Sequence, residues 1–272
     1  TGAAFPGDEP AVQLLESDAL AERGNAPRSF RDCAIDPDRP ATILFTSGST
    51  REPQPAVHSC ANHLANAAAA NEIHALGLGD RWLLSLPMYH VGGLAIMFRC
   101  LLAGAAIVLP VPGKSLTAAL GTNTATHVSL VPTQLKRLLE VSSITGEGNA
   151  LRCMLLGGAA TPDALIEQAL ARGLPVFKTY GMTETSSQVA TVDPGAPREK
   201  RFTAGRALSC SSLRVAADGE LLVRGDSLFL GYFDGSGTRS QADEQGWFAS
   251  GDIGHMDLDG YVSVTGRKDS RF

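Results

Sequence analysis

Short apolar runs alternate with segments of helical length through the middle of this 272-residue chain. The runs are rich in strand-favouring residues, and we expect strands at 41–46, 82–86, 105–109, 127–131, 151–156 and 176–180. Helices are expected between them, at 60–76, 92–102, 132–140 and from a cap at 161–163 to about 172. Short buried strands that alternate with helices are typical of a mostly parallel sheet with flanking helices, so the sequence predicts an α/β fold.

The pattern changes after about residue 195. Asp218-Gly219 and Asp259-Gly260 each stand between two apolar runs, and an Asp-Gly pair in that position is a strong signal for a β-hairpin. We therefore expect an irregular lead-in over 1–40 with one short helix near 12–22, an α/β core over 41–194, and a small antiparallel β subdomain over 195–272.

Composition and charge exclude several classes of function. The net charge is −5 and no dense run of Lys and Arg occurs, which argues against a nucleic-acid partner. No apolar stretch is long enough for a membrane span, and the first residues have no basic segment typical of a signal peptide. The five cysteines form no CxxC pair and are odd in number, which favours reduced thiols in the cytoplasm, with Cys100 and Cys153 as core residues.

Two glycine-containing turns follow predicted strands and are candidates for ligand binding. The first turn consists of Thr46, Ser47, Gly48, Ser49 and Thr50. Its small residues would let backbone N–H groups approach phosphate oxygens, and its hydroxyls would add hydrogen-bond donors. The second turn, Gly157-Gly158-Ala159, leaves room for a flat group against the backbone. Taken alone, the first turn would more often be an ordinary loop, and the second is a weak signal because Gly-Gly also marks ordinary turns.

A third turn carries an acid beside a hydroxyl. Tyr180, Gly181, Thr183 and Glu184 lie at the end of a predicted strand, where a carboxylate could hold Mg²⁺ next to a phosphate. A helix start capped by Thr183, with Glu184 favoured by the helix dipole, explains the same residues. Since ligands of open α/β sheets bind at the carboxyl ends of strands, the three turns are expected to surround one crevice.

Four motifs together resemble the adenylate-forming superfamily, which includes acyl-CoA synthetases, firefly luciferase and the adenylation domains of peptide synthetases. They are 46–50, 180–184, Ser250-Gly251-Asp252 and 266–269, and they follow in the superfamily's order and approximate spacing. The resemblance runs from about residue 38 to the end. It implies an acid–CoA ligase whose ligands are ATP, Mg²⁺, coenzyme A and a small carboxylic acid.

The resemblance also implies roles for single residues. Residues 46–50 would cradle the β- and γ-phosphates of ATP, Thr183 would contact the α-phosphate, and Glu184 would bind Mg²⁺. At the nucleoside end the adenine would lie against 157–159 and stack on Tyr180, with Gly181 beside it. Asp252 would accept hydrogen bonds from the ribose hydroxyls, Arg267 would make a second ribose contact, and Lys268 or Asp269 would mark a hinge.

The acid site is implied by further segments. Residues 85–93 are similar to a segment of acyl-CoA ligases in which the position of His90 lines the acyl site. Taken alone, His90 would more often be a core or capping histidine. Residues 96–99, 129–135 and 155–160 resemble the o-succinylbenzoate–CoA ligases of menaquinone synthesis, which implies His90, Thr133 and Ser187 near an aromatic acid.

The sequence departs from the superfamily in two ways. Arg51 stands where the phosphate loop normally has glycine, and Gln54 where it has lysine. The chain is also shorter at both ends than the superfamily pattern, which has a lysine-bearing C-terminal domain, so we expect either a fragment of a longer protein or a remnant. Another aryl- or fatty-acid adenylating enzyme, a non-catalytic nucleotide- or acyl-binding remnant, and an α/β interaction domain remain alternatives, and a homodimer is possible.

Overall fold

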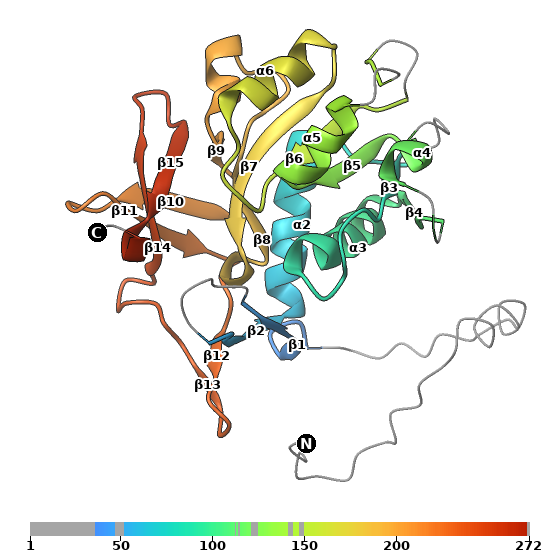
Figure 1. Cartoon of the computed structure of the whole chain (residues 1–272). Helices are drawn as coiled ribbons and strands as arrows, with labels where there is room; N and C mark the ends of the chain where they lie inside the picture. The colour runs from blue at the N-terminus through green and yellow to red at the C-terminus, as the bar shows by residue number, and fades with distance from the viewer. Residues whose placement is uncertain are drawn as a thin grey trace, which may run out of the picture. The chain divides into compact units, whose positions relative to one another are not determined.

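The computed structural model describes residues 36–46, 52–111, 113, 115–120, 125–140, 144–146 and 150–270. The helix expected near 12–22, the turn residues Ser47–Thr50 and Arg51 lie outside this range. The chain divides at Asp36 by its internal contacts, and residues from Pro37 onward belong to one compact unit, which Figure 1 shows in colour.

A seven-stranded sheet forms the centre of this unit, in the order β4-β3-β5-β6-β7-β8-β9. The first five of these strands run parallel, while β8 and β9 run antiparallel to their neighbours. The strands are β3 (Arg81–Leu83), β4 (Ala106–Val108), β5 (His127–Leu130), β6 (Cys153–Leu156), β7 (Val176–Met182), β8 (Ser187–Thr191) and β9 (Arg206–Ala207). The predicted mostly parallel sheet is confirmed.

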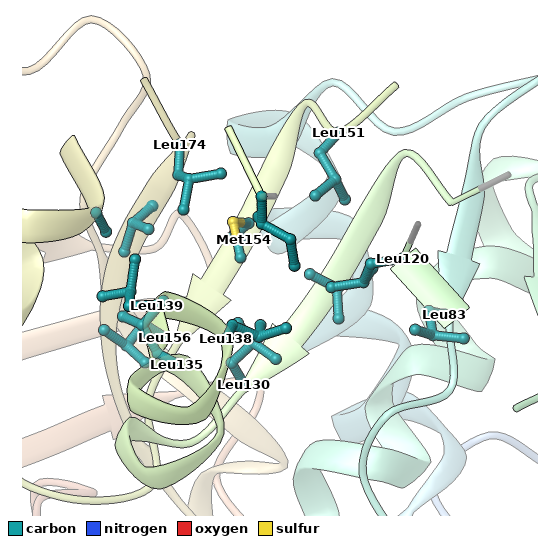
Figure 2. Close-up of a cluster of buried hydrophobic side chains, with 14 of the residues drawn as sticks. Leu83, Leu120, Leu130, Leu135, Leu138, Leu139, Leu151, Met154, Leu156 and Leu174 are labelled. Carbon is teal, nitrogen blue, oxygen red and sulfur yellow. The ribbon is translucent and has the colours of Figure 1, made fainter. Parts of the chain in front are cut away.

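Helices cover both faces of the sheet because consecutive strand residues point to opposite sides. In β6, Met154 and Leu156 belong to one hydrophobic cluster and Cys153 and Leu155 to another. Figure 2 shows the first cluster, in which leucines of the sheet pack against α5. The helices are α2 (Cys60–His74), α3 (Val91–Ala103), α4 (Leu116–Leu120), α5 (Pro132–Glu140) and α6 (Asp163–Ala171).

Cluster membership separates the helices by face. Leu120, Leu135 and Ile166 bring α4, α5 and α6 into the first cluster, and Ile96 and Cys100 bring α3 into the second. The helix α2 packs against α3. The buried Cys100 and Cys153 are core residues as predicted. None of the helices in the described part of the chain has the length and apolar character needed to cross a bilayer.

The strand expected at 41–46 forms, but it does not join the parallel sheet. It is β1 (Pro40–Phe45), which pairs antiparallel with β2 (Pro55–Ser59). These two continue into β12 (Gly231–Phe233) and β13 (Thr238–Arg239) as a separate four-stranded sheet. The sequence did not reveal β2, because a five-residue strand with a leading proline and two polar residues at its end has no periodic signal.

The two predicted hairpins are confirmed. They are β10 (Ser211–Val215) with β11 (Glu220–Gly225), and β14 (Phe248–Met256) with β15 (Val262–Arg267), and they form one antiparallel sheet. Two other elements from beyond residue 195 join neighbouring sheets: β9 extends the seven-stranded sheet, and β12–β13 extends β1–β2. The domain division at residue 195 stays a prediction.

Two local predictions need correction. The helix α6 has Pro162 at its N-cap without a side-chain hydrogen bond, so Thr161 is not its cap. Thr161 donates instead to the carbonyl of Ala159, at 3.4 Å. Thr183 does not begin an α-helix either, since Thr183–Thr185 forms a single 3-10 turn (η1) between β7 and β8. Two more 3-10 turns are η2 (Arg198–Phe202) and η3 (Lys268–Ser270).

Candidate functional site

Tyr180, Asp252 and Arg267, which the resemblance assigned to the nucleoside, lie in direct contact. Tyr180 is buried near the end of β7, and its hydroxyl donates to Oδ2 of Asp252 at 2.7 Å. Arg267 donates from its guanidinium to Oδ1 of the same carboxylate at 3.1 Å. Asp252 and Arg267 face each other across the β14–β15 pairing. Burial, and then the charge of Asp252, raise the pKa of Tyr180 well above its ordinary value, so the phenol stays a donor.

The turn η1 carries Thr183 and Glu184, and residues of other segments hold it in place by hydrogen bonds. The ring of His58, on β2, contacts the carbonyl oxygen of Thr183 through Nε2 at 2.7 Å. The backbone N–H of Phe229 donates to the carbonyl of Glu184 at 2.8 Å, and the hydroxyl of Tyr232 donates to Oε1 of Glu184 at 2.5 Å. A half-buried carboxylate is thus fixed in one direction at the end of β7.

The candidate phosphate turn closes the β1–β2 hairpin. Thr46 and Gln54 stand at its two ends, where the N–H of Thr46 donates to the carbonyl of Gln54 at 3.0 Å. The N–H of Gln54 donates back to Oγ1 of Thr46 at 3.1 Å. Gln54 is exposed, and its neutral amide supplies no positive charge at this end of the turn.

Two of the candidate glycines lie close to atoms of neighbouring strands. A Cβ at Gly181 would lie 1.7 Å from the carbonyl oxygen of Ser187, and a Cβ at Gly157 would lie 2.7 Å from Cγ2 of Thr179. Gly181 therefore cannot take a side chain without moving the β8 backbone, whereas a side chain at Gly157 would displace the methyl group of Thr179. Gly158 and Ala159 follow β6 and are exposed, as a surface for a flat group would be.

The residues predicted for the acid site come from three different elements. His90 is the N-cap of α3 without a side-chain hydrogen bond, and its ring lies 4.6 Å from the exposed ring of Tyr89. Its exposure excludes the core interpretation, and it stands at the capping position of α3 without capping through its side chain. Thr133 is exposed in the first turn of α5. Within the described residues, no hydrogen bond joins His90, Thr133 and Ser187 to one another.

Ser187 leads to a residue that the sequence analysis missed. Its Oγ accepts from the guanidinium of Arg99 at 3.0 Å. Arg99 is only 1% exposed, lies 5.4 Å from the ring centroid of Trp82, and has a buried Nε without a partner. No carboxylate of the described residues pairs with it. Burial lowers the pKa of Arg99 to about 10, which leaves a buried cation at neutral pH.

His58 and Tyr232 were missed as well, for a different reason. Arg99 has a visible signal, a single charge within an apolar helix. Such a charge is costly to bury unless something pairs with it. His58 and Tyr232 have no such signal, because their contacts with η1 join segments far apart in the chain.

The AMP-binding enzyme family matches residues 6–233. The 2-succinylbenzoate–CoA ligase of Bacillus licheniformis is 35% identical over an alignment of 246 residues, and the match covers 85% of this chain and 50% of that ligase. The chain thus spans about half the length of the curated relatives it matches.

Two solved structures of o-succinylbenzoate CoA synthetase from Bacillus subtilis are similar in fold. One is a complex with ATP and magnesium ion, with a TM-score of 0.78 over 88% of this chain and 52% of that one. The other is a complex with the acyl-adenylate intermediate, with a TM-score of 0.77 over 86% and 63%. Both are 32% identical to this chain. The predicted superfamily is confirmed, and this chain belongs to the AMP-binding enzyme family.

Proposed function

We propose that this chain is the nucleotide- and acid-binding core of an ATP-dependent acid–CoA ligase that acts on o-succinylbenzoate. The observation that carries the proposal is the joining of Tyr180, Asp252 and Arg267 from three strands. An aromatic ring beside a carboxylate and a guanidinium suits a nucleoside, whose ribose hydroxyls are donors and whose base has a flat face. The similar Bacillus subtilis structures with ATP and with an acyl-adenylate support this assignment.

The phosphate end of the proposed site lies at η1 and the 46–50 turn. Glu184 offers a hard oxygen ligand of the kind that Mg²⁺ takes together with phosphate oxygens, and its fixed carboxylate fits that use. When bound, Mg²⁺ would neutralise charge on the phosphates. Thr183 would donate to the α-phosphate, and Thr46 to Thr50 would surround the β- and γ-phosphates.

Arg99 supports an acid with a second negative group. A buried guanidinium without a carboxylate partner is costly to the fold unless a ligand supplies the missing charge. o-Succinylbenzoate has two carboxylates, so one can be activated while the other pairs with Arg99 beside Ser187. The exposed His90 and Thr133 are proposed to line the same site at the carboxyl side of the sheet.

The proposed reaction has two steps. An oxygen of the acid attacks the α-phosphorus of ATP, and the bond to pyrophosphate breaks, which leaves an acyl-adenylate. The sulfur of coenzyme A then attacks the acyl carbon, AMP leaves, and the thiol proton passes to solvent. This chain's contribution is to position both reactants and to stabilise the charge that develops.

The cellular setting belongs to the same proposal. The cysteines of the described residues, Cys60, Cys100, Cys153 and Cys210, are free thiols, which suits the reducing cytoplasm. A homodimer stays a prediction, and sedimentation of the purified chain would test it.

Calorimetric titration with AMP, with ATP–Mg²⁺ and with a stable analogue of o-succinylbenzoyl-AMP tests the proposal. We expect the analogue to bind most tightly and ATP–Mg²⁺ weakly, because Gln54 cannot pair with a phosphate as lysine does. Arg99→Met should weaken the analogue by at least about tenfold while AMP binds as before, since a hydrogen bond to a charged group contributes about 1.5–3 kcal/mol.

Two results would count against this function. If the unmodified chain bound none of the three ligands, the assignment of a nucleotide site would be excluded. Equal affinity of Arg99→Met and the unmodified chain for the analogue would exclude o-succinylbenzoate as the substrate and would favour an adenylating enzyme for another acid.

A further inference from the structure

We infer that Tyr232 is a positioning residue, which orients the carboxylate of Glu184 for its metal ion. The inference rests on the proposed function, because it takes Glu184 as the Mg²⁺ ligand. It concerns a residue outside the four motifs, on a strand that the sequence did not connect with the site.

The geometry sets one oxygen of Glu184 apart from the other. The hydroxyl of Tyr232 donates to Oε1 at 2.5 Å, and none of the described residues donates a hydrogen bond to Oε2. The backbone of Glu184 is held independently, by the N–H of Phe229 on its carbonyl. With its backbone fixed and one oxygen engaged, the side chain presents its second oxygen in a defined direction.

The ring of Tyr232 is itself fixed. It lies 4.8 Å from the ring of Phe229 in an edge-to-face arrangement, and Phe229 packs on Phe248 at 5.4 Å. The three rings belong to one small hydrophobic cluster around Ala56. Packing of this kind holds the hydroxyl in place without any ligand, which is what a positioning residue requires.

The strand of Tyr232 also links the two halves of the phosphate site. In the β12–β2 pairing Tyr232 faces Ala56, and β2 is the strand that follows the 46–54 segment. His58, two residues further along β2, contacts the carbonyl of Thr183. The small sheet therefore connects the candidate phosphate turn to η1 through His58 and Tyr232.

General metal-site chemistry gives the expected size of the effect. Carboxylates that bind metal ions are usually oriented by hydrogen bonds from neighbouring groups, and loss of such a neighbour typically costs about 10–100-fold in metal affinity or activity. Tyr232→Phe removes the hydroxyl and keeps the packed ring. The substitution should therefore weaken only the binding of ligands that bind together with the metal ion.

The chain offers a matched set of three tyrosines for the test, each with its hydroxyl on a carboxylate. Tyr232 donates to Glu184, Tyr180 to Asp252, and Tyr261 to Asp193 at 3.3 Å, outside the site. Each is changed to Phe, and binding of AMP without metal and of ATP with Mg²⁺ is measured by calorimetry. Thermal unfolding of each variant confirms that the chain is folded.

We expect Tyr232→Phe to weaken ATP–Mg²⁺ by about tenfold and to leave AMP affinity within twofold. Tyr180→Phe should weaken both ligands alike, and Tyr261→Phe neither. Equal loss of AMP and ATP–Mg²⁺ affinity in Tyr232→Phe would mean a merely structural role, and unchanged ATP–Mg²⁺ affinity would mean no role; either overturns the inference. An unmodified chain that binds no nucleotide would overturn the proposed function and this inference with it.

Discussion

At the scale of single residues, the proposed site contains two carboxylates that other side chains hold in place. Asp252 is engaged by Tyr180 and Arg267, and Glu184 by Tyr232. The two carboxylates differ in surroundings. Asp252 has a cation beside it, so its charge is already balanced, whereas no Lys or Arg of the described residues pairs with Glu184. This difference suits Asp252 to neutral hydroxyls and Glu184 to a cation.

Glu184→Gln tests the assignment of the metal ligand. The substitution keeps size and removes the charge, so ATP–Mg²⁺ affinity should fall by more than the roughly tenfold expected for a supporting residue. AMP affinity without metal should not change. Glu199→Gln is the control, because Glu199 also lies in the first turn of a 3-10 helix but is exposed and outside the site. Metal-dependent binding that survives in Glu184→Gln would assign Mg²⁺ to other residues.

At the scale of elements, β7 carries the site because it changes partner along its length. It pairs parallel with β6 through Lys178, and antiparallel with β8 through Met182, with a break in register between Tyr180 and Gly181. The following η1 returns the chain, and Ser186 at the turn has a φ of 56°. A non-glycine residue in that region carries backbone strain, which is frequent at functional turns.

Gly181→Ala tests the close packing of β7 and β8. A methyl group there would overlap the carbonyl of Ser187, and overpacking of this kind costs about 1–3 kcal/mol of unfolding free energy. Gly266→Ala provides the comparison, since a Cβ at Gly266, on β15, would meet nothing within 4 Å. Urea unfolding of both variants measures the difference. Similar midpoints would show that the β7–β8 contact is looser than the structure has it.

At the scale of the whole molecule, four buried histidines lie among the described residues: His58, His63, His74 and His127. Burial lowers the pKa of all four, to about 4 for His63 and about 3 for His74. They are therefore neutral in the folded chain and take up protons more readily when it unfolds.

Stability should consequently fall with acidification. Between the unfolded pKa of about 6.5 and the folded values, the unfolded state binds more protons, so stability is full above about pH 7 and declines below it. Each fully buried histidine contributes up to about 2 kcal/mol to the decline from pH 7 to pH 5. Carboxylates such as Asp234, whose pKa is lowered to about 2, stay charged in this range.

Denaturant titrations at pH 7, 6 and 5 measure this decline. His63→Gln should reduce the difference between pH 7 and pH 5, while His255→Gln should not, because His255 is exposed. A free energy of unfolding that does not change over this range would mean that the buried histidines are already charged or solvated in the folded chain.

Much of the framework was predictable from local sequence. The helix expected at 132–140 has those bounds in the structure, because its proline favours the first turn and its leucines repeat at helical spacing. Both Asp-Gly hairpins formed where expected, because the turn geometry depends on the turn residues themselves. Tyr180, Asp252 and Arg267 were chosen from motifs, and they meet in space.

The sequence by itself determined the strands of the parallel sheet, most of the helices that cover it and both Asp-Gly hairpins, since periodicity and turn chemistry act over a few residues. Only the tertiary structure decided that β1 leaves the parallel sheet for an antiparallel one, that Arg99 is buried without a carboxylate, and that Tyr232 reaches Glu184. Strand partners and ring contacts join residues that are distant in the chain. Their pairing is selected by the packing of the complete fold, and no local pattern encodes it.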